Sequence, residues 1–289
     1  MDTIYILHMC AVKNTATQTT GLRRATIDKF YTSPATVEQC MKLVETHILV
    51  DPNDLCIEPS AGNGAFIPGI KSLFNNYKFY DLAPEHPEIA PQDYLDFDHK
   101  SVSSGQHHKI HVIGNPPFGR QSSLAIKFIK KSSAYCATIS FILPKSFKKD
   151  SLKKHFPPKF HLAHESDLAD NSFMINGVPY DVPCVFQIWI RKDTDRDTPA
   201  ALCPTSYRFV KRNEHPDISF RRVGVNAGHI DRHITNQSIQ SHYFIKFSVP
   251  LTDTLFNKLK NIVYDCRNNT CGPKSISKQE LIKEFNALC

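Results

Sequence analysis

The chain has 289 residues, which is long enough for one large α/β domain or for one domain with a smaller appendage. Hydrophobic residues make up 41% of it, enough to bury an ordinary core. Lys and Arg number 35 against 28 Asp and Glu, so the net charge is +7. Residues 201–289 alone contain 13 basic and 7 acidic residues. This basic region favours a polyanionic partner, although a solvated basic surface would have the same composition.

The nine cysteines exclude a disulfide framework, because their number is odd and they are scattered from Cys10 to Cys289. No CxxC pair occurs, and Cys266 and Cys271 lack a second ligand pair at a suitable spacing, so we expect no metal site. The apolar stretch 4–12 is too short for a membrane span, and no basic segment precedes it as in a signal peptide. These features predict a soluble, intracellular protein, in the cytoplasm or the nucleus.

Apolar and helical stretches alternate along the first two thirds of the chain. Residues 1–25 carry little pattern and are expected to form an N-terminal arm. Ser33 and Pro34 are typical of a helix start, because Pro is favoured at the first helical position. The predicted helices cover 33–48, 64–74, the stretch around Leu124 and Phe128, and 148–156, and the predicted strands cover 55–57, 77–80, 109–113, 137–143, 173–175 and 185–190.

This order of elements predicts a mostly parallel sheet with helices on both faces. In such a sheet, ligands bind beyond the carboxyl ends of the strands. Asn176 and Gly177 are expected to form a hairpin turn between the last two predicted strands. The charged, Pro-containing stretch 193–204 predicts a domain boundary, and the region beyond it is aromatic and basic with a weaker pattern.

A turn of small residues follows the first predicted strand, over residues 58–66. Gly62 and Gly64 let the backbone approach a ligand closely and adopt torsions closed to other residues. The turn is too short for a Walker loop and lacks the third glycine of a dinucleotide fingerprint. Asp81 ends the next predicted strand, where an acid can accept hydrogen bonds from both hydroxyls of a ribose, although a lone Asp there is more often a turn former.

The most informative motif is Asn115-Pro116-Pro117-Phe118, directly after the third predicted strand. The exocyclic amine of adenine is a poor nucleophile because its lone pair is delocalised into the ring. The Asn115 side-chain oxygen and the Pro116 carbonyl can accept its two hydrogens and favour the tetrahedral geometry that attack requires. The two prolines restrict the backbone and remove competing N–H donors. Phe118 offers a face for stacking a planar ring, worth roughly 1–3 kcal/mol per base.

Taken together, these motifs resemble those of the amino-methyltransferases with an Asn-Pro-Pro-Phe/Tyr motif, especially the N6-adenine DNA methyltransferases of the gamma order, over about residues 26–192. They are also similar to methyltransferases of large DNA viruses and phages. The resemblance implies a Rossmann-like class I methyltransferase fold with a mostly parallel seven-stranded sheet and a smaller C-terminal region. It divides the chain into an arm (1–25), an S-adenosylmethionine-dependent methyltransferase domain (26–195) and a basic substrate-recognition region (205–289).

The resemblance also implies S-adenosylmethionine as the cofactor, with S-adenosylhomocysteine as its product. Residues 28–34 look like the motif that packs on the methionine part of the cofactor. Residues 93–95 look like the motif whose acid binds the cofactor's adenine, although Asp96 and Asp98 lie close enough to serve instead. The implied cofactor residues are Phe30, Tyr31, Thr32, Glu58, Ser60, Ala61, Gly62, Gly64, Phe66, Asp81, Leu82, Asp93, Tyr94 and Asn115, and the implied catalytic residues are Asn115, Pro116, Pro117 and Phe118.

Residues outside these motifs are expected to contact nucleic acid, with DNA preferred over RNA. Phe147 follows the strand after the catalytic motif and is expected either to wall the target-base pocket or to lie in the apolar core. Aromatic and cationic residues alternate in the C-terminal region, where cations can neutralise phosphates and rings can stack on bases. The candidates there are Arg208, Lys211, Arg212, Arg221 and Arg222.

The sequence predicts methyl transfer to the N6 amine of adenine in DNA, and three alternatives stay open. The acceptor could be adenine in RNA, or the planar amide of a glutamine in a protein, which the same Asn-Pro-Pro motif also holds. A third alternative is a non-catalytic binding subunit that has kept the fold, although the intact motif at Asn115 favours an enzyme.

Overall fold

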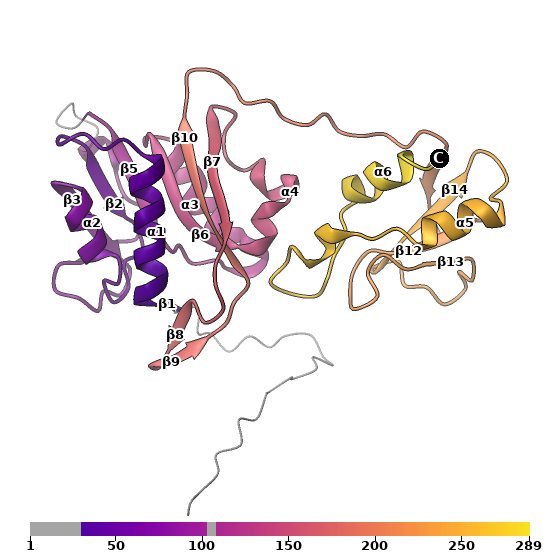
Figure 1. The fold of residues 1–289 in the computed structure, drawn as a ribbon, viewed down its shortest axis with the longest axis horizontal. Helices are drawn as coiled ribbons and strands as arrows, with labels where there is room; N and C mark the ends of the chain where they lie inside the picture. Colours follow the sequence, from indigo (N-terminus) through magenta and orange to yellow (C-terminus); the bar gives the residue numbers. More distant parts are fainter. Residues whose placement is uncertain (1–29, 103–107) are drawn as a thin grey trace, which may run out of the picture.

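The protein consists of two folded units joined by one extended linker (Figure 1). The structure is a computed structural model that describes residues 30–102 and 108–289. The predicted arm, and Asp28 and Lys29 of the leading motif, lie outside the described residues. No helix or strand lies between Arg191 and Tyr207, the stretch that contains this linker.

A seven-stranded sheet forms the centre of the first unit, with strand order β4-β3-β2-β5-β6-β10-β7. Neighbours from β4 to β6 are parallel, whereas β10 runs antiparallel to both β6 and β7. The predicted mostly parallel seven-stranded sheet is therefore confirmed. The bounds are β2 (Leu55–Glu58), β3 (Asn76–Asp81), β4 (Ala90–Pro91), β5 (Ile110–Gly114), β6 (Thr138–Pro144), β7 (Phe160–Asp167) and β10 (Cys184–Arg191).

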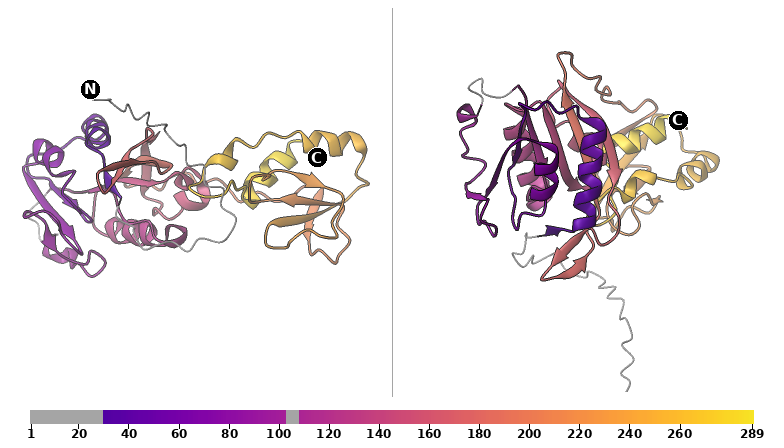
Figure 2. Two further views of the ribbon diagram at one scale, coloured as in Figure 1. Left: turned by 90° about the horizontal axis from the view of Figure 1, so that it is seen from below. Right: turned by 60° about the vertical axis from the view of Figure 1, so that its left-hand side comes forward.

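Helices cover both faces of this sheet, so its central strands β2, β5 and β6 are wholly buried (Figure 2). The helices α1 (Pro34–His47) and α2 (Ile67–Leu73) share one hydrophobic core with alternate strand residues such as Cys56 and Ile113. The helix α3 (Ser123–Ser133) packs on the other face, with strand residues of opposite parity such as Ile57. Ser33 caps α1 as predicted, because its side chain accepts a hydrogen bond from the backbone N–H of Thr36.

A small three-stranded sheet forms from segments that are far apart in the sequence. β1 (Tyr31–Thr32) pairs with β8 (Phe173–Ile175), which continues through a hairpin into β9 (Val178–Tyr180). Asn176 and Gly177 form the predicted turn, with φ angles of 50° and 76°. The predicted partner strand was wrong, however, since the turn joins β8 to β9 and not to β10.

Two further predictions for the first unit are corrected. The predicted helix 148–156 is reduced to a 3-10 turn at Lys145–Lys148 and one short helix, α4 (Asp150–Lys153). Strand β7 was not predicted at all. It is the edge strand, and most of its residues remain partly exposed, so its sequence lacks the continuous apolar run of a central strand.

The second unit is a four-stranded antiparallel sheet with helices along one face (Figure 2). Its core joins aromatic strand residues such as Tyr207 and Phe220 to helix residues such as Leu281 and Phe285. The bounds are β11 (Tyr207–Val210), β12 (Ile218–Arg221), β13 (Ile230–Asp231), β14 (His242–Phe247), α5 (Asp253–Lys260) and α6 (Lys278–Asn286). No helix in the described part of the chain is long and apolar enough to cross a membrane.

The second unit contacts the first at the edge where β6 ends and β10 begins. Lys149 Nζ donates hydrogen bonds to the backbone oxygen of Ser275 at 2.7 Å and forms an ion pair with Glu280 at 3.4 Å. Nearby, Cys271 Sγ donates to the carbonyl of Pro183 at 2.6 Å. Because β6 runs parallel to β2 and β5, this is the edge at which the parallel strands have their carboxyl ends.

A buried polar pair stabilises the opposite edge of the sheet. His111 Nε2 lies 3.0 Å from Asp54 Oδ2, and His111 Nδ1 lies 2.8 Å from the hydroxyl of Thr138. The Asp54 carboxylate also accepts the backbone N–H groups of Asp51 and Lys109. Burial alone would raise the pKa of Asp54, but these donors outweigh it and lower the pKa below its usual range.

We expect Asp54→Asn to lower the free energy of unfolding by about 2–4 kcal/mol. The NH2 group of the asparagine would face a backbone N–H group and could not accept a hydrogen bond from it. Urea denaturation measures the change. Asp51→Asn is the matched control, since Asp51 is partly exposed and an amide oxygen can still accept from Asn53; it should change stability by less than about 0.5 kcal/mol. Equal losses in both variants would contradict this account of Asp54.

Candidate active site

A cavity of about 370 Å³ lies at the carboxyl ends of β2, β3 and β5. This is the edge where ligands bind in open α/β sheets, and the volume is within the usual range for small-molecule sites. Its lining consists of Phe30, Tyr31, Thr32, Glu58, Pro59, Ser60, Ala61, Gly62, Asn63, Ala65, Phe66, Asp81, Leu82, Gln92, Asp93, Tyr94, Leu95, Asn115, Pro116, Pro117, Phe118, Leu124 and Phe128.

The small-residue turn and the acid after β3 are joined by hydrogen bonds. Asp81 Oδ2 accepts the backbone N–H of Gly62 at 2.8 Å, and Oδ1 accepts that of Ala83 at 2.8 Å. Gly62 has φ of +54°, and a Cβ at this position would lie 3.4 Å from the ring of Tyr31. The turn therefore holds the Asp81 carboxylate at the cavity with its remaining lone pairs available for a ligand.

Hydrogen bonds hold the side-chain amide of Asn115 in one of its two possible orientations. Its Nδ2 donates to the carbonyl of Phe30 at 3.2 Å and to Thr32 Oγ1 at 3.3 Å, both from the segment at β1. Because the Phe30 carbonyl only accepts, the nitrogen and the oxygen of the amide are distinguished. Asn115 Oδ1 is buried and has no hydrogen-bond partner among residues 30–102 and 108–289. A buried acceptor at the cavity wall is thus available to the donor of a ligand.

Glu58 supplies a second such atom. Its side chain is 2% exposed, and Oε2 has no hydrogen-bond partner within the described chain. Burial and, to a smaller extent, the charge of Asp81 raise the pKa of the Glu58 carboxyl to about 8. A cationic or N–H-bearing ligand in the cavity would satisfy this carboxyl and favour its charged form.

The third predicted acid also reaches the cavity. Asp93 lines it, whereas Asp96 and Asp98 do not. The neighbouring Tyr94 contributes only its buried ring, because its hydroxyl is hydrogen-bonded to Ser132 at 2.8 Å and to Tyr135 at 2.5 Å. Of the three candidate acids, Asp93 is therefore the one placed to contact a ligand in the cavity.

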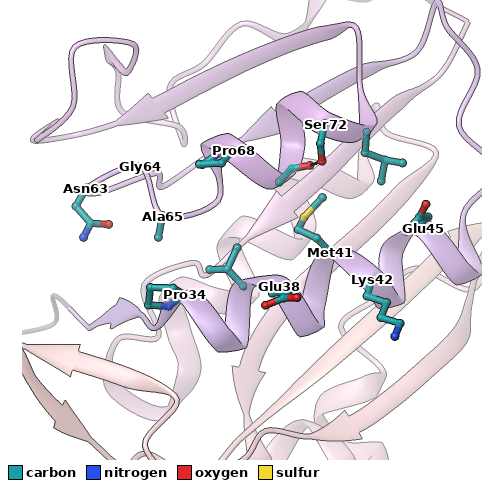
Figure 3. A pocket seen from close by; sticks show the side chains of 13 residues that line it. Pro34, Glu38, Met41, Lys42, Glu45, Asn63, Gly64, Ala65, Pro68 and Ser72 are labelled. Carbon is teal, nitrogen blue, oxygen red and sulfur yellow. Dashed lines mark hydrogen bonds between the residues drawn. The ribbon is translucent and has the colours of Figure 1, made fainter.

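Two predicted site residues do not line the cavity. Gly64, with φ of +82°, lines a separate hollow of about 710 Å³ between α1 and α2, as Figure 3 shows. A Cβ on Gly64 would lie 2.8 Å from Ile67, so the turn itself requires this glycine. Phe147 is fully buried in the core that α3 covers, because the 3-10 turn after β6 directs its ring inward. Of the two roles expected for Phe147, the core role is the one observed.

The predicted nucleic-acid residues of the second unit do not form one cluster. Lys211 and Arg212 line a groove there, whereas Arg208, Arg221 and Arg222 lie outside it. Arg221 donates to the backbone oxygen of Val223, and Arg222 donates to that of Gln240. These two guanidinium groups are therefore partly engaged in holding loops of their own unit.

The sequence analysis missed several cavity residues. Leu124 and Phe128 are four apart on α3, so the spacing of the helix after the catalytic motif could have indicated them. The others lie in or beside loops that the sequence did indicate. Pro59, Asn63 and Ala65 belong to the predicted turn 58–66 and Leu95 to the predicted motif 93–95, whereas Gln92 lies outside both. Among the described residues, no group of three or more His, Cys, Asp or Glu side chains is placed to hold a metal ion.

No protein-family model and no curated protein sequence matches the chain. Among solved structures, PH1948 from Pyrococcus horikoshii is 12% identical with a TM-score of 0.44, over 60% of this chain and 92% of that one. The 23S rRNA methyltransferase ErmE is 14% identical with a TM-score of 0.41, over 60% and 74%. TrmN from Thermus thermophilus is 16% identical with a TM-score of 0.37; the alignment covers 55% of this chain and 49% of TrmN, about half its length. These likenesses are distant, so the function of the cavity has to be inferred from its own residues.

The raised pKa of Glu58 predicts a pH-dependent cost to folding. Between its ordinary value of 4.5 and about 8, the unfolded chain releases the Glu58 proton while the folded chain keeps it. Stability should therefore fall as pH rises through this window, by on the order of 4 kcal/mol from this group. Glu58→Gln has no proton to release, so its free energy of unfolding should fall less between pH 5 and pH 8, measured by urea denaturation at both values. Parallel pH profiles of the two proteins would refute the assignment.

Proposed function

We propose that the chain is an S-adenosylmethionine-dependent methyltransferase that transfers a methyl group to the exocyclic N6 amine of adenine in DNA. The observation that carries this proposal is the orientation of Asn115. Its amide nitrogen is held by Phe30 and Thr32, and its buried oxygen is left without a partner at the cavity. An acceptor of this kind suits an amine that must present its hydrogens while its lone pair attacks.

The residues at the strand ends fit the cofactor. Asp81 has free lone pairs for ribose hydroxyls, Glu58 Oε2 lacks a donor, and Asp93 lies at the same cavity. S-adenosylmethionine supplies a sulfonium methyl group, which is a good electrophile without further activation. Cofactor binding thus accounts for the buried carboxyl of Glu58, which is costly to leave unsatisfied.

The chain's own groups then act on the acceptor. Asn115 Oδ1 and the Pro116 carbonyl accept the two hydrogens of the amine, which draws its lone pair out of conjugation with the ring. Phe118 lies on the cavity wall and offers its partly buried ring for stacking. A strong general base is not required, because the nitrogen becomes cationic as the N–CH3 bond forms and the S–CH3 bond breaks, and the cationic nitrogen then releases its proton to solvent.

The choice of adenine in DNA is supported by the motif order, by Phe118 and by the basic second unit. Nucleoside analysis of DNA and RNA incubated with the protein and the labelled cofactor tests it directly. Labelled N6-methyladenine in DNA supports the proposal. A label found only in RNA or in protein glutamine would show that adenine in DNA is not the acceptor. Absence of both labelling and cofactor binding would overturn the enzyme assignment.

We expect Asn115→Ala to bind S-adenosylmethionine as the wild type does and to reduce methyl transfer by at least about a hundredfold, since an interaction made in the transition state is lost. Calorimetry measures binding, and a labelled-cofactor assay measures transfer. Asn75→Ala, an exposed asparagine at the end of α2, is the control and should keep full activity. Transfer at the wild-type rate by Asn115→Ala would rule out its role.

We expect Asp81→Ala to weaken cofactor binding by at least about tenfold, because it removes a charged acceptor and releases the Gly62 turn. The measurement is calorimetric titration with S-adenosylmethionine. Asp96→Ala, an exposed acid outside the cavity, should leave the affinity unchanged. An unaltered affinity in Asp81→Ala would exclude the ribose-binding role.

A further inference from the structure

A groove of about 510 Å³ opens on the second unit, where β11 ends and β14 begins. Ten residues line it, of which three carry a positive charge and none is acidic. The three cations are Lys211, Arg212 and Lys278. No sequence pattern predicted a binding role for Lys278. The groove is therefore suited to an anionic ligand.

Aromatic rings lie among these cations. Phe209 and Tyr243 are both partly exposed, and their centroids lie 5.6 Å apart at an interplanar angle of 76°. Lys278 Nζ stands 4.0 Å from the centre of the Phe209 ring. Ile239, which is 69% exposed, adds an apolar side chain to the same wall. The ligand should thus carry apolar planar groups as well as negative charge.

We infer that this groove binds unpaired nucleotides of a single-stranded polynucleotide, with bases against Phe209 and Tyr243 and phosphates at Lys211, Arg212 and Lys278. In a duplex, the base faces are stacked on one another and cannot reach the rings, so only an unpaired strand offers both chemistries at once. The role of the groove in the reaction rests on the proposed function. If the chain methylates adenine, the nucleotides beside the target adenine are unpaired when they lie in the groove.

The position of the second unit supports this role. Its contacts through Lys149 and Pro183 join it to the edge of the sheet at which the cavity lies. A polynucleotide bound in the groove is therefore held on the side of the first unit at which the cavity lies. The contact also explains how a cavity whose described lining contains no Lys or Arg can serve a polyanionic acceptor.

The test is binding of short single-stranded DNA and RNA of one sequence, and of the matching duplex, to the full chain by fluorescence anisotropy over a series of salt concentrations. The wild type should bind both single strands more tightly than the duplex, and the two single-strand affinities show which sugar is preferred. A preference for the duplex, or tighter binding of an acidic aromatic peptide, would overturn the inference.

The charge variant is Lys211→Gln with Lys278→Gln, and the matched control is Lys258→Gln with Lys283→Gln, two exposed lysines of α5 and α6 outside the groove. The groove pair should bind about tenfold more weakly at ~0.1 M salt and should reduce the slope of log affinity against log salt by roughly 1.4. The control pair should do neither. Equal losses in both pairs would show only a diffuse charge effect and would overturn the assignment.

The ring variant is Phe209→Leu, which keeps an apolar side chain at the edge of the core and removes the stacking surface. It should weaken binding by roughly tenfold while the salt slope stays as in the wild type. Thermal denaturation checks that it folds. Unchanged affinity in a folded Phe209→Leu protein would refute the stacking role.

Calorimetry with S-adenosylmethionine separates this inference from the proposed function. All groove variants should bind the cofactor as the wild type does. If the wild type binds no cofactor but the groove variants still lose the oligonucleotide, the methyltransferase proposal fails and the groove assignment stands. If the cofactor binds and the oligonucleotide does not, the groove assignment fails alone.

Discussion

The hydrogen bonds that hold the Asn115 amide connect three distant parts of the chain at one point. Asn115 directly follows β5, its acceptors belong to the β1 segment, and β1 is itself held in place by pairing with β8. A catalytic acceptor needs a fixed direction, and an amide can rotate unless its nitrogen is engaged. The small β1-β8-β9 sheet gives the amide that direction. The β8-β9 hairpin, which comes late in the sequence, thus contributes to a site formed mainly by the early strands.

The same edge of the sheet concentrates unfavourable electrostatics. Glu58 is buried beside Asp81, and the pKa of Glu58 rises to about 8 because burial and a like charge both oppose its ionisation. On the opposite edge, Asp54 is equally buried but fully hydrogen-bonded, and its pKa falls. The contrast separates a carboxylate that stabilises the fold from one that has an oxygen with no partner among the described residues. Polar groups left unsatisfied in this way are typical of sites in which stability is sacrificed for binding.

Much of the first unit follows from local sequence patterns, because parallel central strands are short apolar runs and their carboxyl ends must meet at one edge. The cavity residues Asp81 and Asn115 could be predicted for that reason. Strand β7 could not, since an edge strand lacks the apolar run, and neither could Phe147, whose direction depends on a 3-10 turn. The second unit was the least predictable, because its strands pair antiparallel across long loops and Lys278 joins the groove only through tertiary packing.

The place of β10 in the sheet has a consequence for how the chain folds during synthesis. Strand β7 precedes β10 in sequence but pairs with β10 alone, so it has no neighbour until residues 184–191 have left the ribosome. Among the described residues, those lining the cavity of about 370 Å³ lie before position 129, yet the hairpin that holds β1 and the strand that completes the sheet come later. The nascent chain therefore passes through a stage in which an unpaired edge at β6 is exposed, and that stage ends when residues 184–191 pair with β6.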